Sequence, residues 1–192
     1  MPEYRRTYVP GGSYFLTIST YNRAPIFRTP ENISRLREAI KIVKTDMPFD
    51  IVGAVTLPDH LHFIWTLPPE DERYPIRVGR LKSVFTKLLP HNHHPVINLP
   101  KSRRKRRESG VWQRRFWEHT LRDEEDFQRH LDYIHYNPVK HGYARCPHAW
   151  PSSSFRQWVK KGGYKWDWCC TCEERMPDIP NFTDIEPIVG EL

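Results

Sequence analysis

The chain has 192 residues, enough for one domain with a sizeable core but too few for two full domains. It carries 30 Lys and Arg against 23 Asp and Glu, a formal net charge of +7, together with seven Trp, nine Tyr and nine Phe. Cations neutralise phosphates and rings stack on unpaired bases, so this mixture favours a nucleic-acid partner over the simpler alternative of a merely basic protein. No run of about 18 apolar residues and no export signal occur, which argues against a membrane span and predicts a cytoplasmic protein.

Hydrophobic periodicity and turn residues predict four strands and three helices. The predicted strands cover 13–20, 49–57, 60–67 and 110–120, and the predicted helices cover 30–47, 76–89 and 124–137. Asp123 suits the N-cap of the last helix because its side chain can accept a hydrogen bond from the first turn, where three acidic residues also complement the helix dipole. Pro138 is expected to end this helix.

The order strand, helix, strand, strand, helix, strand is that of a ferredoxin-like α+β sandwich. We therefore predict an antiparallel sheet with helices on one face, the other face open, and a last helix appended as the catalytic helix. Residues 1–168 are expected to form a single catalytic domain. Residues 90–110 are a basic insertion that contains the run KSRRKRR, and residues 169–192 are an irregular C-terminal tail.

Two histidines, His60 and His62, lie within the third predicted strand. Side chains on a strand alternate between faces, so both imidazoles project from one surface while Leu61, Phe63 and Trp65 project from the other. Imidazoles on one face of a strand are a candidate metal-binding edge. The alternative is a pair of histidines that make ordinary hydrogen bonds.

The last predicted helix offers a second cluster of polar groups. Turning about 100° per residue along the helix, Leu131 and Ile134 mark the buried stripe. Tyr133 and Asn137, one turn apart, lie together along one flank of this stripe, whereas Tyr136 points almost opposite to the core. A phenol and a carboxamide can therefore converge on one point. The alternative is a ring at the core border and an amide at the helix end.

These groups suggest phosphodiester chemistry. Two imidazoles and the Asn137 oxygen would leave positions open around Mg²⁺ or Mn²⁺ for phosphate oxygens and water. The ion would polarise the scissile phosphate while the Tyr133 phenolate attacks phosphorus, and the resulting ester conserves the bond energy without ATP. An unperturbed phenol has a pKa near 10, so the ion and nearby cations must favour its ionised form.

Four stretches, in order along the chain, resemble the REP-associated tyrosine transposases of bacteria, where REP is a repetitive extragenic palindrome. The stretches are YRR at 4–6, LPDHLHFIWTLP at 57–68, VWQRRFWEH at 111–119 and DYIHYNPVKHG at 132–142. This family is related to the insertion-sequence transposases that have a His-hydrophobic-His motif and one catalytic tyrosine. The resemblance runs from Tyr4 to about Trp168.

The resemblance implies a ferredoxin-like fold and metal-dependent cleavage of single-stranded DNA at REP hairpins, through a 5′-phosphotyrosyl link and a free 3′-OH. His60 and His62 match the family's metal ligands, and Tyr133 matches its nucleophile. Asn137, a shorter amide, falls where related insertion-sequence enzymes have a glutamine ligand. The implied cofactor is Mg²⁺ or Mn²⁺, and we expect a monomer, with a dimer as the alternative.

Candidate DNA-binding residues combine guanidinium groups for phosphate or guanine with rings for stacking. In the matched stretches they are Tyr4, Arg5, Arg6, Trp112, Arg114, Arg115 and Trp117. In the basic insertion they are Arg103, Arg104, Lys105, Arg106 and Arg107, which are expected to bind phosphates rather than to recognise bases. The alternative for each ring is core packing, and for the basic run a solvated loop.

The four cysteines, Cys146, Cys169, Cys170 and Cys172, are not evenly spaced as in a disulfide framework, so reduced thiols are expected. A zinc site from the C-C-x-C cluster is disfavoured, because no CxxC pair or matching histidine spacing accompanies it.

Two other functions compete with a transposase. A DNA-binding regulator that recognises the palindrome without cutting is disfavoured by the intact His60, His62 and Tyr133. A replication initiator or relaxase is disfavoured by the order of the motifs and by the lack of a helicase-like region.

Overall fold

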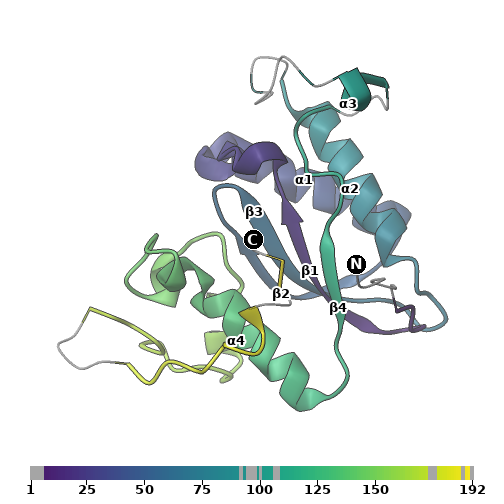
Figure 1. Ribbon diagram of the computed structural model, residues 1–192. Helices are drawn as coiled ribbons and strands as arrows, with labels where there is room; N and C mark the ends of the chain where they lie inside the picture. The colour runs from purple at the N-terminus through teal and green to yellow at the C-terminus, as the bar shows by residue number, and fades with distance from the viewer. Residues whose placement is uncertain are drawn as a thin grey trace.

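The centre of the fold is a four-stranded antiparallel sheet with strand order β2-β3-β1-β4 (Figure 1). The computed structural model describes residues 7–90, 93, 99, 101–105, 109–172, 177–186 and 189–190, without the side chains of residues 103 and 104. The strands are β1 (Ser13–Ser19), β2 (Asp50–Thr56), β3 (His60–Thr66) and β4 (Trp117–Thr120). The predicted α+β fold and antiparallel ferredoxin-like order are confirmed, with β1 and β3 in the centre of the sheet.

One face of the sheet is covered by α1 (Pro30–Asp46) and α2 (Tyr74–Leu88). Leu61, Phe63 and Trp65 of β3 enter this core, as the alternation along the strand predicts. A short helix, α3 (Lys101–Lys105), stands beyond the end of α2 and away from the sheet (Figure 1).

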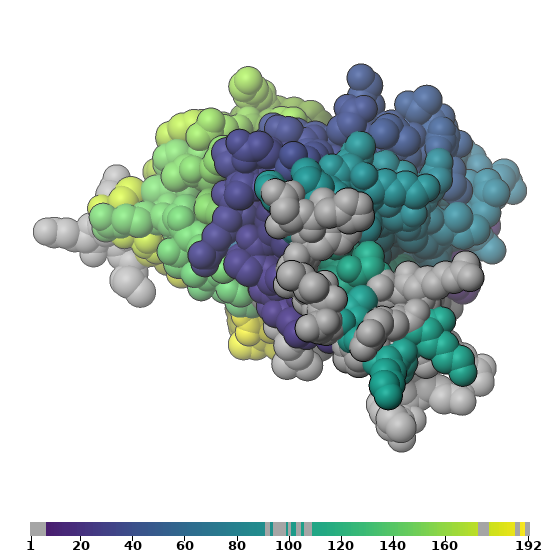
Figure 2. Space-filling model, turned by 90° about the horizontal axis from the view of Figure 1, so that it is seen from above, coloured from purple at the N-terminus to yellow at the C-terminus, as the bar shows by residue number. Residues whose placement is uncertain are grey.

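The second face of the sheet is also covered, which corrects the expectation of an open face. Helix α4 (Glu124–Lys140) lies across it, and its Leu131 and Ile134 pack with Phe15 and Ile64 of the central strands. Figure 2 shows the same division from above, with the blue and teal residues of α1 and α2 on the right and the green and yellow C-terminal half on the left. Because both faces of β1 and β3 are buried, these two strands lie inside the molecule.

Helix α4 begins as predicted but does not end at its proline. Asp123 caps it by accepting a hydrogen bond from the Asp126 amide at 2.8 Å. Pro138 lies within the helix, which continues to Lys140. Proline removes a single amide donor, and at the end of the helix the His141 amide still donates to the Asn137 carbonyl at 3.1 Å. The last turn therefore closes despite the proline.

Strand β4 is shorter than the predicted 110–120. Trp112 makes only an isolated bridge with Thr20, and the chain rejoins the sheet at Trp117. Helix α2 starts two residues earlier than predicted, at Tyr74, because Pro75 suits the first turn of a helix, where no amide donor is needed.

The C-terminal half of the chain closes the second face. It contains α5 (Phe155–Lys160) and a disulfide between Cys146 and Cys170, which corrects the expectation of four reduced thiols. The two cysteines meet because the Thr171 amide donates to the Arg145 carbonyl at 2.8 Å, so the chain after α4 lies beside the tail. Within the described residues, no helix has the length and apolar content that a bilayer crossing requires.

Gly53 sets how closely α4 approaches the sheet. It lies at an irregularity in the pairing of β2 with β3, and a Cβ there would lie 2.8 Å from Leu131 Cδ1 and 3.3 Å from Ile134 Cδ1. A larger residue would therefore force the Leu131 side chain to move or the helix to shift outward.

We predict that Gly53→Val lowers the free energy of unfolding by about 1–3 kcal/mol, because the added methyl groups overpack this contact. Gly79→Ala is the matched control, since a Cβ at Gly79 in α2 meets nothing within 4 Å and alanine favours a helix. Urea unfolding of both variants measures the difference. A Gly53→Val chain as stable as the parent would show that α4 is not seated at this distance.

Candidate active site

The two histidines of β3 lie on the face covered by α4, as their spacing predicts. His60 is 1% exposed and His62 is 0% exposed, and their ring centroids are 4.9 Å apart. In the sheet they lie opposite Ser19 and Thr17 of β1. Burial on a central strand holds both imidazoles in fixed positions between the sheet and the helix.

A hydrogen bond to Nδ1 fixes the orientation of each ring. Asp59 accepts from His60 Nδ1 at 2.6 Å. Thr17 Oγ1 lies 2.9 Å from His62 Nδ1 and donates its own proton to the Val189 carbonyl, so His62 Nδ1 must be the donor of that bond. Both rings therefore carry their proton on Nδ1, and the nitrogen that can ligate a metal is Nε2. Partners of this kind are typical of the second shell around metal-ligating histidines.

Asp59 is suited to hold His60 because it stays ionised. Burial raises its pKa, but the hydrogen bond from His60 and the charges of His60 and Arg23 outweigh burial and lower the pKa below its usual value. The Arg23 guanidinium lies 3.6 Å from the carboxylate. The sequence motif contains Asp59, but sequence analysis did not identify it as a site residue.

Tyr133 of α4 faces the histidines. Its ring is 0% exposed and lies 5.7 Å from the His62 ring, centroid to centroid, at 74°. Lys140 Nζ donates a hydrogen bond to the Tyr133 hydroxyl at 2.7 Å and forms an ion pair with Glu186 at 3.1 Å. An ammonium at this distance stabilises negative charge on the phenol oxygen. Sequence analysis missed Lys140, although it lies seven residues from Tyr133, two turns along the same face.

The flank of α4 that carries Tyr133 also carries Asn137 and then His141, at intervals of one turn. Asn137 is buried. The His141 ring lies 5.5 Å from the His60 ring, centroid to centroid. The predicted cluster of His60, His62, Tyr133 and Asn137 thus comes from two elements that meet, and His141 joins it without having been predicted.

The C-terminal segment covers this cluster. The Phe182 ring packs edge-on against Tyr133 at 5.4 Å and stacks on Tyr136 at 5.6 Å, centroid to centroid. Gly190, at φ +68°, lies so close to Trp117 that a Cβ would be 2.6 Å from the Trp117 Cβ. Tyr136 is therefore partly covered by the tail, which the helical pattern alone did not predict.

A second cluster joins β4 to α4. His119 Nε2 lies 2.8 Å from an Asp126 carboxylate oxygen, and His130 Nδ1 lies 3.0 Å from the other oxygen. These three groups offer ligand atoms within 4.8 Å of one another. Burial lowers the pKa of His130, so its ring is neutral near pH 7.

The predicted DNA-binding residues differ in their exposure and in their position relative to the histidines. Trp117 lies opposite Thr17, which lies opposite His62, so these residues form one row across the sheet on the face of the histidines. Arg114 and Arg115 are exposed. Trp112 is 7% exposed and packs against Phe27 and Phe85, a placement that favours core packing over base stacking.

The basic insertion is only partly described. Lys105 is exposed in α3, and for Arg103 and Arg104 the backbone of that helix alone is described. Tyr4, Arg5, Arg6, Arg106 and Arg107 lie outside the described residues.

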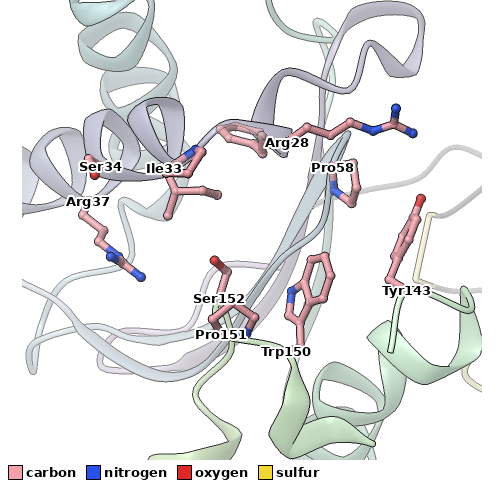
Figure 3. A pocket seen from close by; sticks show the side chains of 11 residues that line it. Arg28, Ile33, Ser34, Arg37, Pro58, Tyr143, Trp150, Pro151 and Ser152 are labelled. Carbon is pink, nitrogen blue, oxygen red and sulfur yellow. The ribbon is translucent and has the colours of Figure 1, made fainter. Parts of the chain in front are cut away.

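A cavity of about 490 Å³ opens next to the histidine strand (Figure 3). Its wall includes Pro58, two residues before His60, and the rings of Tyr143 and Trp150, which stack 5.7 Å apart. Arg28 and Arg37 contribute guanidinium groups from the other side. Sequence analysis did not identify this cavity, because its walls come from α1, the β2–β3 connection and the chain after α4.

The chain is similar to several known proteins. Residues 9–137 match the family model described as "Transposase IS200 like". A REP-associated tyrosine transposase of Escherichia coli (strain K12) is 39% identical over 190 residues, covering 99% of this chain and 100% of that protein. A Haemophilus influenzae protein that carries the same name with a provisional qualifier is 46% identical over 168 residues, covering 88% of this chain and 93% of that protein.

A solved structure of a REP-associated tyrosine transposase bound to a REP hairpin is 37% identical to this chain. It superposes with a TM-score of 0.73, covering 95% of this chain and 96% of that one. The resemblance inferred from the four sequence stretches is confirmed.

The cover over the phenol can be tested by chemical modification. We predict that tetranitromethane leaves Tyr133 unmodified in the intact chain and nitrates it readily in Phe182→Ala, because the substitution opens the tail contact above the ring. Peptide mass spectrometry measures the modification. Tyr14, buried in the core beneath α1 and α2, is the control and should stay unmodified in both chains. Equal nitration of Tyr133 in the two chains would contradict the packing.

Proposed function

Because this chain belongs to the family of IS200-like transposases, we propose that it cleaves single-stranded DNA at REP hairpins and transfers the cut strand, with Tyr133 as nucleophile. The observation that carries the proposal is the meeting of two elements. Tyr133, hydrogen-bonded to Lys140, lies beside His62, and both histidines have their Nδ1 atoms engaged by Asp59 and Thr17. An active site needs the phenol, the ammonium and the imidazoles to lie together, whereas core packing alone does not require it.

The residues present fit a divalent ion. His60 and His62 would contribute Nε2, and we propose that the Asn137 amide or the His141 ring, whose centroid lies 5.5 Å from that of His60, completes the set. Mg²⁺ or Mn²⁺, once bound, would polarise the scissile phosphate and offset its charge in the transition state. The fit rests on the two Nδ1 hydrogen bonds, which aim both rings before any ion arrives.

The covalent step would exchange one phosphodiester for another. The Tyr133 oxygen, after its proton has passed to water, attacks phosphorus, and the bond from phosphorus to the 3′ oxygen breaks. The 5′ phosphate then remains on Tyr133, and the 3′ oxygen takes a proton from water, so that the other strand end leaves as a free 3′-OH. The Lys140 ammonium, 2.7 Å from the phenol oxygen, would stabilise its charge before attack.

The cavity beside Pro58 supports a single-stranded substrate. Tyr143 and Trp150 offer rings on which an unpaired base can stack, and Arg28 and Arg37 offer charges for its phosphates. A paired duplex would not present its bases to these rings. The hairpin itself is the ligand of the solved relative, and we transfer it to this chain as part of the proposal.

A binding-only regulator is the second candidate, and the complete burial of Tyr133 beneath Phe182 favours it. In the enzyme, the C-terminal segment that carries Phe182 must move before DNA can reach the phenol.

The two tyrosines of the motif distinguish these functions. Tyr133→Phe should bind hairpin DNA normally yet form no covalent adduct, because no oxygen remains to attack phosphorus. Tyr136→Phe is the matched control and should still trap DNA, since Tyr133 is the tyrosine that lies beside His62 and accepts the hydrogen bond of Lys140. Mass spectrometry of the trapped complex should find a 5′ phosphate on Tyr133. An adduct on Tyr136, or a 3′ link, would refute the assignment, and no adduct in the parent chain would support the regulator.

Chelation tests the ion. EDTA should abolish cleavage while sparing hairpin binding, and Mg²⁺ or Mn²⁺ should restore cleavage. Replacing both His60 and His62 with Ala should mimic the chelator. Thr17→Val removes the partner of His62, together with the hydrogen bond from Thr17 to the Val189 carbonyl, and should weaken metal affinity by about 10–100-fold, as loss of an outer-shell partner does. Full cleavage in EDTA would leave the histidines with a structural role.

A further inference from the structure

Four metal-binding side chains gather at a site remote in sequence from the histidines of β3. Cys146 and His148 follow α4, and Cys170 and Cys172 lie in the tail. One ligand atom from each of Cys146, His148 and Cys170 lies within 4.8 Å of the others. The Cys172 Sγ lies 3.3 Å from the Cys146 Sγ, and the Cys170 Sγ lies 3.7 Å from His148 Nδ1.

The backbone holds the two ligand pairs side by side. The Thr171 amide and hydroxyl both donate to the Arg145 carbonyl, at 2.8 and 3.1 Å, and the Arg145 guanidinium donates to the Thr171 carbonyl at 3.2 Å. A Cys-x-His segment and a Cys-x-Cys segment are thus fixed against each other. His148 lies in a 3-10 turn (Pro147–Ala149) that begins directly after Cys146, and its ring comes close to the sulfur of Cys170.

We propose that Cys146, His148, Cys170 and Cys172 form a structural zinc site. Three thiolates and one imidazole are a common closed donor set for Zn²⁺. Sulfur ligands at about 2.3 Å from zinc lie about 3.8 Å from one another in a tetrahedron. A sulfur and an imidazole nitrogen around the same ion lie about 3.6 Å apart, and Cys170 Sγ lies 3.7 Å from His148 Nδ1. The 3.3 Å between Cys146 Sγ and Cys172 Sγ would have to lengthen by about 0.5 Å, which a side-chain shift can supply.

The disulfide and the zinc site are alternative states of the same residues. A disulfide between Cys146 and Cys170 uses two of the four donors. It does not explain why the thiol of Cys172 lies beside Cys146. A cellular thiol reductant would supply two electrons and two protons to this bond and become a disulfide itself. Zn²⁺ would then displace three thiol protons, and His148 Nδ1 would exchange its 2.9 Å bond to the Trp166 carbonyl for the ion.

The fourth cysteine is excluded from the set by its direction. Cys169, adjacent to Cys170, is buried and its thiol points to the Asp178 carbonyl at 3.6 Å. Sequence analysis disfavoured zinc because the C-C-x-C cluster had no partner of suitable spacing, and the structure supplies that partner from the chain after α4.

Metal content under reducing conditions tests the site. The intact protein, purified with a phosphine reductant and without added metal, should contain one equivalent of zinc by elemental analysis. Replacement of zinc by Co²⁺ should produce the intense d–d bands of a tetrahedral ion and sulfur-to-cobalt charge transfer in the near ultraviolet. This measurement on the parent chain does not depend on any variant being folded.

Variants assign the ligands. Cys146→Ser and Cys172→Ser should lose the charge-transfer intensity of one thiolate each and bind zinc more weakly, whereas Cys169→Ser, the matched control, should be unchanged. A chain with both His60 and His62 replaced by Ala should keep its full zinc, which separates this site from the ion of the proposed cleavage. Reduced protein without zinc, cobalt spectra without thiolate bands, or equal loss in Cys169→Ser would overturn the proposal.

Discussion

The packing of α4 against the second face of the sheet is the contact on which the site depends. Gly53 has no side chain to separate α4 from the sheet, so Leu131 and Ile134 pack close to its backbone. His135 adds a polar anchor: its Nε2 lies 2.9 Å from Ser154 Oγ, which accepts from the Ala54 amide of β2. With the helix seated in this way, the phenol of one element lies beside the imidazoles of another, although about seventy residues separate them in the chain.

The C-terminal segment both covers and supports this site. Phe182 closes over Tyr133, Glu186 pairs with Lys140, and the Val189 carbonyl accepts the proton of Thr17, which in turn sets the donor direction of His62. Removal of the segment would therefore uncover the phenol and also release the hydroxyl that orients a histidine. The proposed zinc site lies at the start of this segment, where it would tie the tail to the end of α4.

Local patterns predicted the fold and half of the site. Alternation along β3 placed His60 and His62 opposite Leu61, and helical periodicity placed Tyr133 on the flank of the buried stripe, because both depend only on backbone geometry. Because Pro138 was expected to end α4, Lys140 lay outside the predicted helix and was not identified as a site residue. Local patterns did not predict that α4 covers the second face, that Phe182 covers Tyr133, or that Cys146 meets Cys172. Each of these contacts depends on where distant segments pack, which no local period records.

The central claim is that Tyr133 and the histidines of β3 form one metal-dependent active site. Anomalous diffraction from crystals soaked in Mn²⁺ tests it most directly, because it locates the ion independently of activity. The account predicts one strong peak in contact with Nε2 of His60 and Nε2 of His62, adjacent to the Tyr133 hydroxyl. A peak at His119, Asp126 and His130 instead, with none at the β3 histidines, would contradict it.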